Sequence, residues 1–198
     1  MEAVQIVQGT AVPLDRSDVD TDQIIPAEYL KRIERTGFGP FLFAEWRKDP
    51  DFVINDPRYA GASILLTGAN FGSGSSREHA PWAIEDAGFR AIIAPSFADI
   101  FRNNCTKVGL LPVELRMESV RALMDAVLDD PTTRIVVDLK RRSVTAPDLD
   151  ETFDIEDFTA WRLLEGLDDI GLTMRKLDEI AAYESARPAR VDTTALPV

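Results

Sequence analysis

A glycine-rich loop at residues 68–79, GANFGSGSSREH, carries the densest group of polar side chains in the sequence. It follows a short apolar run and precedes a predicted helix. Its glycines let the backbone bend sharply and let a ligand approach closely, and the free N–H groups at a helix start attract negative charge. Arg77 adds a planar guanidinium that can hold a carboxylate through two parallel hydrogen bonds. These residue types predict an anion site that suits a carboxylate.

Two other interpretations of this loop compete with the carboxylate site. Ser75 and Glu78 have the spacing of a capping box, in which the serine only caps the following helix. Nucleotide loops need a different pattern, because G-x-G-x-x-G is absent and no lysine follows as in G-x-x-x-x-G-K-[ST]. The residues alone therefore disfavour a nucleotide and leave Ser75 as either a helix cap or a chemical group.

A second polar cluster lies at residues 18–26, DVDTDQIIP. Its acids suit a solvated turn or an EF-hand-like loop, but the glycine and the glutamate that an EF-hand requires are missing, so calcium is not expected. His79 stands at a predicted helix start, where a lone histidine is typical of a hydrogen-bonded structural residue. Cys105 lies on an apolar helical face, which indicates a buried and unreactive thiol.

The composition excludes several classes of protein. The 198 residues include 34 acidic and 22 basic side chains, and this net charge of −12 argues against nucleic-acid binding. One cysteine and one histidine cannot make an internal disulfide, a conventional zinc site or an iron–sulfur site unaided. No apolar run is long enough to cross a membrane and no signal peptide is apparent. We therefore expect one globular domain in the cytoplasm.

The elements that must position the loop follow from the spacing of apolar residues. Runs at residues 62–66 and 90–94 predict buried strands on either side of the loop, with a helix of about ten residues that ends at Gly88. A final helix over residues 172–184 is expected to bury Leu177, Ile180 and Ala181. Between them we expect helices at 97–108 and 117–129 and strands at 110–115, 134–139 and 143–146. This alternation is typical of an α/β protein.

Three segments together resemble a known family. They are residues 20–26 (DTDQIIP), residues 72–80 (GSGSSREHA), and residues 97–104 (FADIFRNN) followed by 109–112 (GLLP). In this combination the chain resembles the small subunits of bacterial 3-isopropylmalate dehydratase, which are swivelling domains of the aconitase superfamily. The resemblance implies an α/β fold, with a single swivelling β/β/α domain over residues 1–186 and a mixed central sheet flanked by helices. Residues 187–198 are expected to form a disordered tail.

The resemblance also implies an activity. The family is a hydro-lyase of leucine biosynthesis that interconverts 2-isopropylmalate and 3-isopropylmalate by dehydration and rehydration. A [4Fe–4S] cluster is expected on a large partner subunit, so this chain is expected to bind no cofactor and to act as half of a heterodimer. Its implied substrate is a small dicarboxylate hydroxy acid, and neither nucleic acid nor membrane is an expected partner.

The family's roles fall on residues of both polar clusters. By resemblance Ser75 is the base that removes a proton next to a carboxylate, and Arg77 holds a substrate carboxylate. A helix start and an adjacent guanidinium would both stabilise the negative form of the serine. The residues expected to contact the substrate are Gly74, Ser76, Thr21, Asp22, Tyr29, Leu30 and Arg32. Those expected to support the loop from behind are Asn70, Glu78 and His79.

Two alternative functions stay open from the sequence. A related protein acting on homoaconitate or on citramalate-type and methylmalate-type acids would share the loop. A third substrate carboxylate would then need an extra arginine, for which Arg32 and Arg35 are candidates. A noncatalytic module that regulates a partner is the other alternative, and the intact residues 75–77 argue against it.

Overall fold

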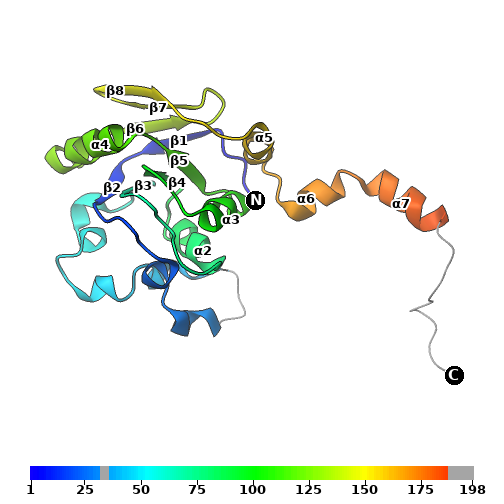
Figure 1. Ribbon diagram of the computed structural model, residues 1–198, viewed down its shortest axis with the longest axis horizontal. Coiled ribbons are helices and arrows are strands. Elements are labelled where there is room, and N and C mark those ends of the chain that lie inside the picture. The colour runs from blue at the N-terminus through cyan, green and yellow to red at the C-terminus, as the bar shows by residue number, and fades with distance from the viewer. Residues whose placement is uncertain (32–35, 187–198) are drawn as a thin grey trace.

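The computed structural model describes residues 1–31 and 36–186, whose strands form two four-stranded sheets (Figure 1). One sheet is parallel, in the order β2-β3-β4-β5, and the other is antiparallel, in the order β1-β6-β7-β8. The strands are β1 Ile6–Gly9, β2 Ala11–Leu14, β3 Ile64–Thr67, β4 Ala91–Ala94, β5 Leu111–Glu114, β6 Ile135–Asp138, β7 Ser143–Ala146 and β8 Leu149–Thr152.

Helices cover the parallel sheet and link it to the antiparallel one. The α-helices are α1 Thr21–Ile24, α2 His79–Asp86, α3 Asp99–Val108, α4 Met117–Asp129, α5 Asp157–Glu165, α6 Asp169–Met174 and α7 Leu177–Ala186. Short 3-10 turns fill the connection between β2 and β3: η1 Ala27–Lys31, η2 Gly39–Phe41, η3 Trp46–Lys48, η4 Val53–Asn55 and η5 Pro57–Tyr59. Helices α2 and α3 pack together, whereas α4 packs along β2, β3 and β4. In Figure 1 the layers run from the antiparallel sheet through the parallel sheet to α2 and α3, as the β/β/α expectation requires.

The α/β class is confirmed, but the strands form two sheets of one kind each where the sequence predicts one mixed sheet. The reason lies in the connections. Strands β2 to β5 are separated by long crossovers, which parallel pairing requires, whereas β6, β7 and β8 are joined by short turns that favour antiparallel pairing. Every residue of β3 and β4 is buried, as in a sheet covered on both faces, whereas β8 alternates between half-buried and exposed residues.

Several predicted elements are found nearly where their apolar spacing places them. Helix α4 spans Met117–Asp129 as predicted, and α3 ends at Val108, followed by the C-cap Gly109, whose φ of 85° lies in the left-handed region. Helix α2 has eight residues and ends at Asp86, two residues before Gly88. The described chain holds no helix that is long and apolar enough to cross a membrane.

The prediction for the last helix is wrong. In its place are two shorter helices, α6 and α7, and α7 leads away from both sheets (Figure 1). As a result Leu177 is 49% exposed, Ala181 is exposed and Ile180 is only half-buried. The apolar spacing of these residues predicts that one face of the helix is covered, but neither sheet extends far enough to cover α7. The predicted tail at residues 187–198 lies outside the described residues, and the single domain over 1–186 stays a prediction.

Candidate active site

Three loops meet at one edge of the parallel sheet. They follow β2, β3 and β4, and the second of them is the glycine-rich loop. Because these strands are parallel neighbours, their carboxyl ends lie at the same edge, and ligands of open α/β sheets bind outside that edge. The fold therefore places both polar clusters of the sequence at one site.

Backbone hydrogen bonds join the two clusters. The N–H of Gly72 donates to the carbonyl of Val19 at 2.8 Å, and the N–H of Thr21 donates to the carbonyl of Ser73 at 2.9 Å. Asp20 and Ser73 form an isolated parallel bridge. The loop after β3 is thus fixed in position against the segment after β2 by main-chain groups, whatever side chains stand there.

The first cluster starts helix α1 and forms a capping box. The N–H of Gln23 donates to Asp20 Oδ1 at 2.8 Å, and the N–H of Asp20 donates to Gln23 Oε1 at 3.0 Å. This reciprocal bonding satisfies two donors at the helix start. It gives the cluster a structural explanation other than calcium binding, and it presents Thr21 and Asp22 toward the glycine-rich loop.

The glycines at 72 and 74 permit a backbone that other residues disfavour. Their φ angles are +80° and +91°, in the left-handed region. A Cβ on Gly72 would lie 2.5 Å from Phe101 Cβ, which is too close, whereas one on Gly74 would make an ordinary contact of 3.5 Å with Thr21 Oγ1. The sharp bend predicted from the sequence is confirmed at both positions.

Ser75 does not cap helix α2. The helix begins at His79 and is preceded by Glu78, whose side chain makes no capping bond, so Ser75 stands three residues before the N-cap. The capping-box interpretation is wrong because residues 75–77 form a turn, in which the N–H of Arg77 donates to the carbonyl of Ser75 at 2.8 Å. The free N–H groups at the start of α2 were expected to stabilise the negative form of Ser75. Because α2 starts at His79, these groups are remote from the serine.

Thr21 holds the exposed Ser75 in place. Its Oγ1 donates to the carbonyl oxygen of Ser75 at 3.1 Å and lies 3.5 Å from Ser75 Oγ. Thr21 is itself buried, whereas Gly74, Ser75 and Ser76 are exposed. The serine hydroxyl is therefore open to a ligand on one side and held from behind on the other.

Arg77 is paired with a carboxylate of the first cluster. Its guanidinium is in direct contact with Asp22 Oδ1, and the arginine side chain is 25% exposed against 57% for the aspartate. A guanidinium has five N–H donors, so Arg77 can bind Asp22 and an external carboxylate together. The predicted clamp is thus positioned beside Ser75 and supported by Asp22.

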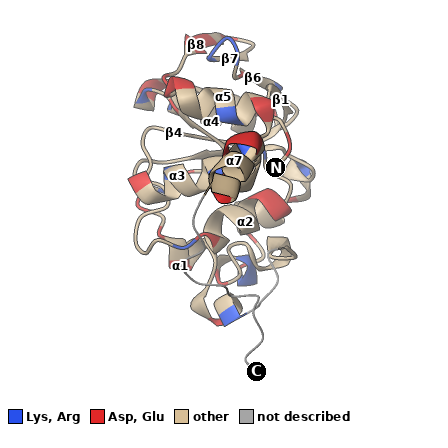
Figure 2. Cartoon of the chain, turned by 90° about the vertical axis from the view of Figure 1, so that its right-hand side faces the viewer, with Lys and Arg blue, Asp and Glu red and all other residues tan. Residues whose placement is uncertain are grey.

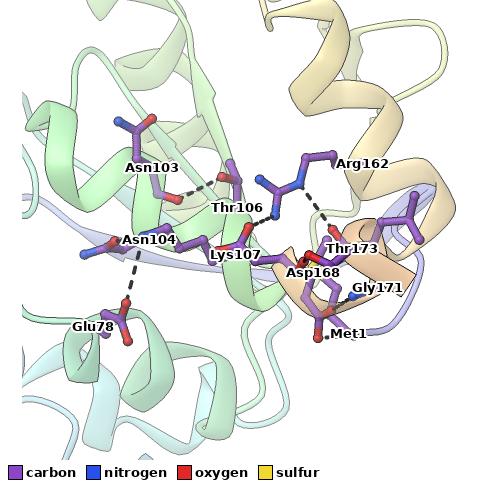
Figure 3. Close-up of polar contacts among 12 residues, drawn as sticks. Met1, Glu78, Asn103, Asn104, Thr106, Lys107, Arg162, Asp168, Gly171 and Thr173 are labelled. Atoms are coloured by element: carbon purple, nitrogen blue, oxygen red, sulfur yellow. Dashed lines mark hydrogen bonds and ion pairs between the residues drawn. The ribbon is translucent and has the colours of Figure 1, made fainter. Parts of the chain in front are cut away.

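Asn70 and Glu78 connect the loop to its neighbours. Asn70 has a φ of +55°, and its Nδ2 donates to Asp18 Oδ1 at 2.8 Å. Glu78 Oε1 lies 3.8 Å from Lys107 Nζ on α3 (Figure 3). These contacts join the two ends of the loop to neighbouring segments, and the supporting role of both residues stays a prediction.

His79 packs among aromatic rings at the first turn of α2. Its ring centroid lies 4.7 Å from that of Trp82 and 5.4 Å from that of Phe38. Burial lowers the pKa of His79 below its ordinary value, and nearby Glu78 only partly opposes this. The imidazole is therefore neutral at neutral pH and acts as part of the packing under the loop, which agrees with a structural role.

Tyr29 and Leu30 lie on η1 and are half-buried against the core. The ring of Tyr29 stacks on Phe41, with centroids 4.2 Å apart. These packing contacts join the two residues to the core rather than to Ser75 or Arg77. Arg32 and Arg35 lie outside the described residues.

The donors of this chain do not fit an iron–sulfur cluster. Such a cluster needs several thiolates, and Cys105 is fully buried on α3, where burial raises the pKa of its thiol well above the ordinary value. Over residues 1–31 and 36–186, no three His, Cys, Asp or Glu side chains gather in a way that could hold a metal ion.

Ser96 is a site residue that the sequence analysis missed. Its Oγ accepts from the N–H of Asn70 at 2.9 Å, and its carbonyl accepts from the N–H of Phe71 at 3.2 Å. Ser96 follows the predicted strand at 90–94 by two residues. The rule that carboxyl ends of parallel strands meet at one edge was the available signal, because it applies to β4 as well as to β3.

The chain is similar to known proteins of one family over nearly its full length. The family model of the aconitase C-terminal domain matches residues 1–118, and the model of the C-terminal domain of 3-isopropylmalate dehydratase small subunits matches residues 169–191. The 3-isopropylmalate dehydratase small subunit of Rubrobacter xylanophilus is 61% identical over 188 residues, which are 95% of this chain and 96% of that one. The small subunit of Frankia casuarinae is 63% identical over 195 residues, 98% of this chain and 100% of that one. A crystal structure of 3-isopropylmalate dehydratase from Methanocaldococcus jannaschii is 27% identical, with a TM-score of 0.68 over 89% of this chain and 99% of that one.

Proposed function

The chain belongs to the family of 3-isopropylmalate dehydratase small subunits, and from this premise we propose that residues 74–77 supply the base and a carboxylate clamp of the reaction. Members of the family are hydro-lyase subunits of leucine biosynthesis. The observation that carries the proposal is the pairing of Ser75 with Arg77 on one exposed turn, each held by a residue of α1.

In the proposed reaction Ser75 Oγ removes a proton from the carbon next to a substrate carboxylate. The electron pair of the broken C–H bond forms a double bond as the hydroxyl leaves the neighbouring carbon. A serine is a weak base in water, so its negative form needs stabilisation. The positive charge of Arg77, two residues further along the same turn, favours that form.

Arg77 binds one substrate carboxylate through its planar fork and sets the proton within reach of Ser75. Asp22 holds the guanidinium in this orientation before the substrate arrives. In this proposal the exposed Ser76 and the N–H group of Gly74, the residue before the turn, donate to the substrate. For Tyr29 and Leu30 we propose a place at the rim of this site, on η1, which follows α1.

The departing hydroxyl requires a group that this chain lacks. The buried, protonated Cys105 does not fit as a cluster ligand, so we propose that a large partner protein holds a [4Fe–4S] cluster and completes a heterodimer. Such a cluster supplies a Lewis acid for the leaving hydroxyl. The small-subunit names of the relatives support the partner, and the substrate in those names supports 2-isopropylmalate and 3-isopropylmalate over homoaconitate or citramalate. The cytoplasmic location stays a prediction.

A matched pair of serine substitutions tests the base. In the complex reconstituted with the large subunit, Ser75→Ala should lower kcat by about 10²- to 10⁴-fold, because general base catalysis contributes that much. Ser73→Ala is the control, since Ser73 bonds to Val19 and Thr21 through its backbone, which alanine keeps. Thermal unfolding should be unchanged in both variants. A Ser75→Ala complex with near-normal kcat would contradict the proposal.

The clamp is tested by Arg77→Lys. Lysine keeps the charge but offers a point charge in place of the fork, so kcat/KM should fall about as far as in Arg77→Ala. Steady-state kinetics of both variants in the same complex measure this. If lysine keeps activity close to that of the unsubstituted complex, Arg77 contributes only general electrostatics.

A further inference from the structure

Helices α6 and α7 carry an apolar stripe that the domain does not cover. Among their described residues, 169–174 and 177–186, none is buried. Ile170 is 72% exposed, Met174 is 52% exposed and Leu177 is 49% exposed. Ile170 and Met174 lie one turn apart on α6, Leu177 begins α7, and the half-buried Ile180 follows one turn later; these four side chains are the apolar stripe.

The base of this segment is anchored to α5. Arg162 donates to Asp169 Oδ1 at 2.7 Å, and the guanidinium of Arg175 lies 5.2 Å from the ring centroid of Trp161 and 3.8 Å from Glu165. Figure 3 shows Arg162 reaching from α5 toward the first turn of α6, beside Asp168. Helix α6 is therefore held in a fixed direction relative to the sheets.

Helix α7 has no comparable anchor. Within residues 1–31 and 36–186, no hydrogen bond or ion pair joins α7 to the body of the domain, and Figure 1 shows it well away from both sheets. A ten-residue helix without tertiary cover is marginal in water. Its apolar side chains and its length are suited to a groove on another molecule.

We propose that α6 and α7 dock into a groove of the large subunit, with the apolar stripe on its floor. This inference rests on the proposed function, because it takes the partner from there. Residues 169–191 match a family model for the C-terminal domains of small subunits, which is separate from the model of the aconitase domain. The segment is thus a feature of chains that work beside a separate large subunit.

The charge of α7 favours a different chain over a second copy of this one. Asp178, Glu179 and Glu184 give α7 three acids and no base, and Figure 2 shows the acidic colour on this helix where it faces the viewer. Two copies packed through α7 would bring like charges together, in a chain whose net charge is already −12. The groove should therefore have an apolar floor and a basic rim, as in helix-in-groove recognition.

Aspartate substitutions in the full-length chain test the docking surface. Met174→Asp and Leu177→Asp should each weaken binding to the large subunit by about 10- to 100-fold, as expected when a buried apolar side chain is replaced by a charge. Leu128→Asp is the matched control, because Leu128 is 50% exposed on α4 in the body of the domain. Affinities are measured by titration of the large subunit, and circular dichroism checks that each variant is folded.

Two outcomes overturn the docking proposal. One is a dissociation constant for Leu177→Asp and Met174→Asp within about twofold of that for Leu128→Asp. The other is a dimer of the unsubstituted chain alone that Leu177→Asp dissociates, since the stripe would then bind a second copy. At saturating large subunit the Met174→Asp and Leu177→Asp variants should keep kcat, whereas Ser75→Ala should bind normally and lose kcat. A failure of the docking surface is thereby distinguished from a failure of the proposed base.

Discussion

Replacement of Gly72 by alanine should destabilise the chain through two separable effects. The first is backbone strain, because a φ of +80° is disfavoured for any residue with a Cβ, at about 1–2 kcal/mol. The second is steric, since the new Cβ would lie 2.5 Å from Phe101 Cβ and Cδ1. Phe101 is 2% exposed and packs edge-on against Phe71, so it cannot swing aside. Such overpacking adds about 1–3 kcal/mol.

Gly61 provides a matched control for the strain. Its φ is +77°, and a Cβ there would meet no atom within 4 Å. Gly61→Ala should therefore show only the first effect, and the loss of unfolded-state freedom is the same in both variants. The difference between the two free energies of unfolding isolates the contact with Phe101.

Urea unfolding of the isolated chain measures both values. We expect Gly61→Ala to lose about 1–2 kcal/mol and Gly72→Ala about 2–5 kcal/mol. For a chain of this size each kcal/mol corresponds to about 2–4 °C in Tm. Equal losses in the two variants would refute the reasoning, because they would mean that α3 and the loop separate without cost.

Three further outcomes follow from the contacts of other residues. Asp22→Asn should lower kcat/KM about tenfold in the complex with little change in Tm, because an exposed ion pair contributes under about 1 kcal/mol; unchanged kinetics would count against its positioning role. Cys105 should resist iodoacetamide at pH 8 until urea unfolds the chain, since burial raises the pKa of its thiol, and rapid alkylation of the folded chain would contradict this. Hydrogen bonds from Ser119 and Arg116 lower the pKa of Glu151, so its stabilisation is present above the ordinary value of 4.5 and is lost as pH falls through the lowered value. Tm profiles of the original chain and Glu151→Gln should therefore converge in acid, and a constant gap would refute the linkage.

The sequence correctly predicted the features that depend on single residues or on the spacing within one element. The bends at Gly72 and Gly74 and the end of α3 at Gly109 depend on the conformational freedom of single residues, and all three are found. The bounds of α4 depend on the apolar spacing within one helix, and they too are confirmed.

The errors concern partners that are distant in the sequence. Ser75 and Glu78 have the spacing of a capping box, but hydrogen bonds from Thr21 to Ser73 and Ser75 hold this stretch as a turn, so the helix starts later. Leu177 has helical apolar spacing but no sheet beneath it. Apolar spacing within each strand does not show which strands pair, and the division into two sheets follows instead from the lengths of the connections, which the prediction did not use.

The bond between Thr21 and Ser75 joins residues 54 positions apart, and this sets when the site can form during synthesis. At about 5–20 residues per second, the ribosome needs roughly 3–11 s to add that length. During this time α1 has neither the turn at residues 75–77 to bond to nor helix α2 to pack on. Strands β7 and β8, which pair only with strands close to them in the sequence, face no such delay once they emerge. The candidate active site is therefore assembled from helix α1, which is synthesised first, and the turn at residues 75–77, which is synthesised later. Slow translation between residues 21 and 75 prolongs the time for which α1 is exposed.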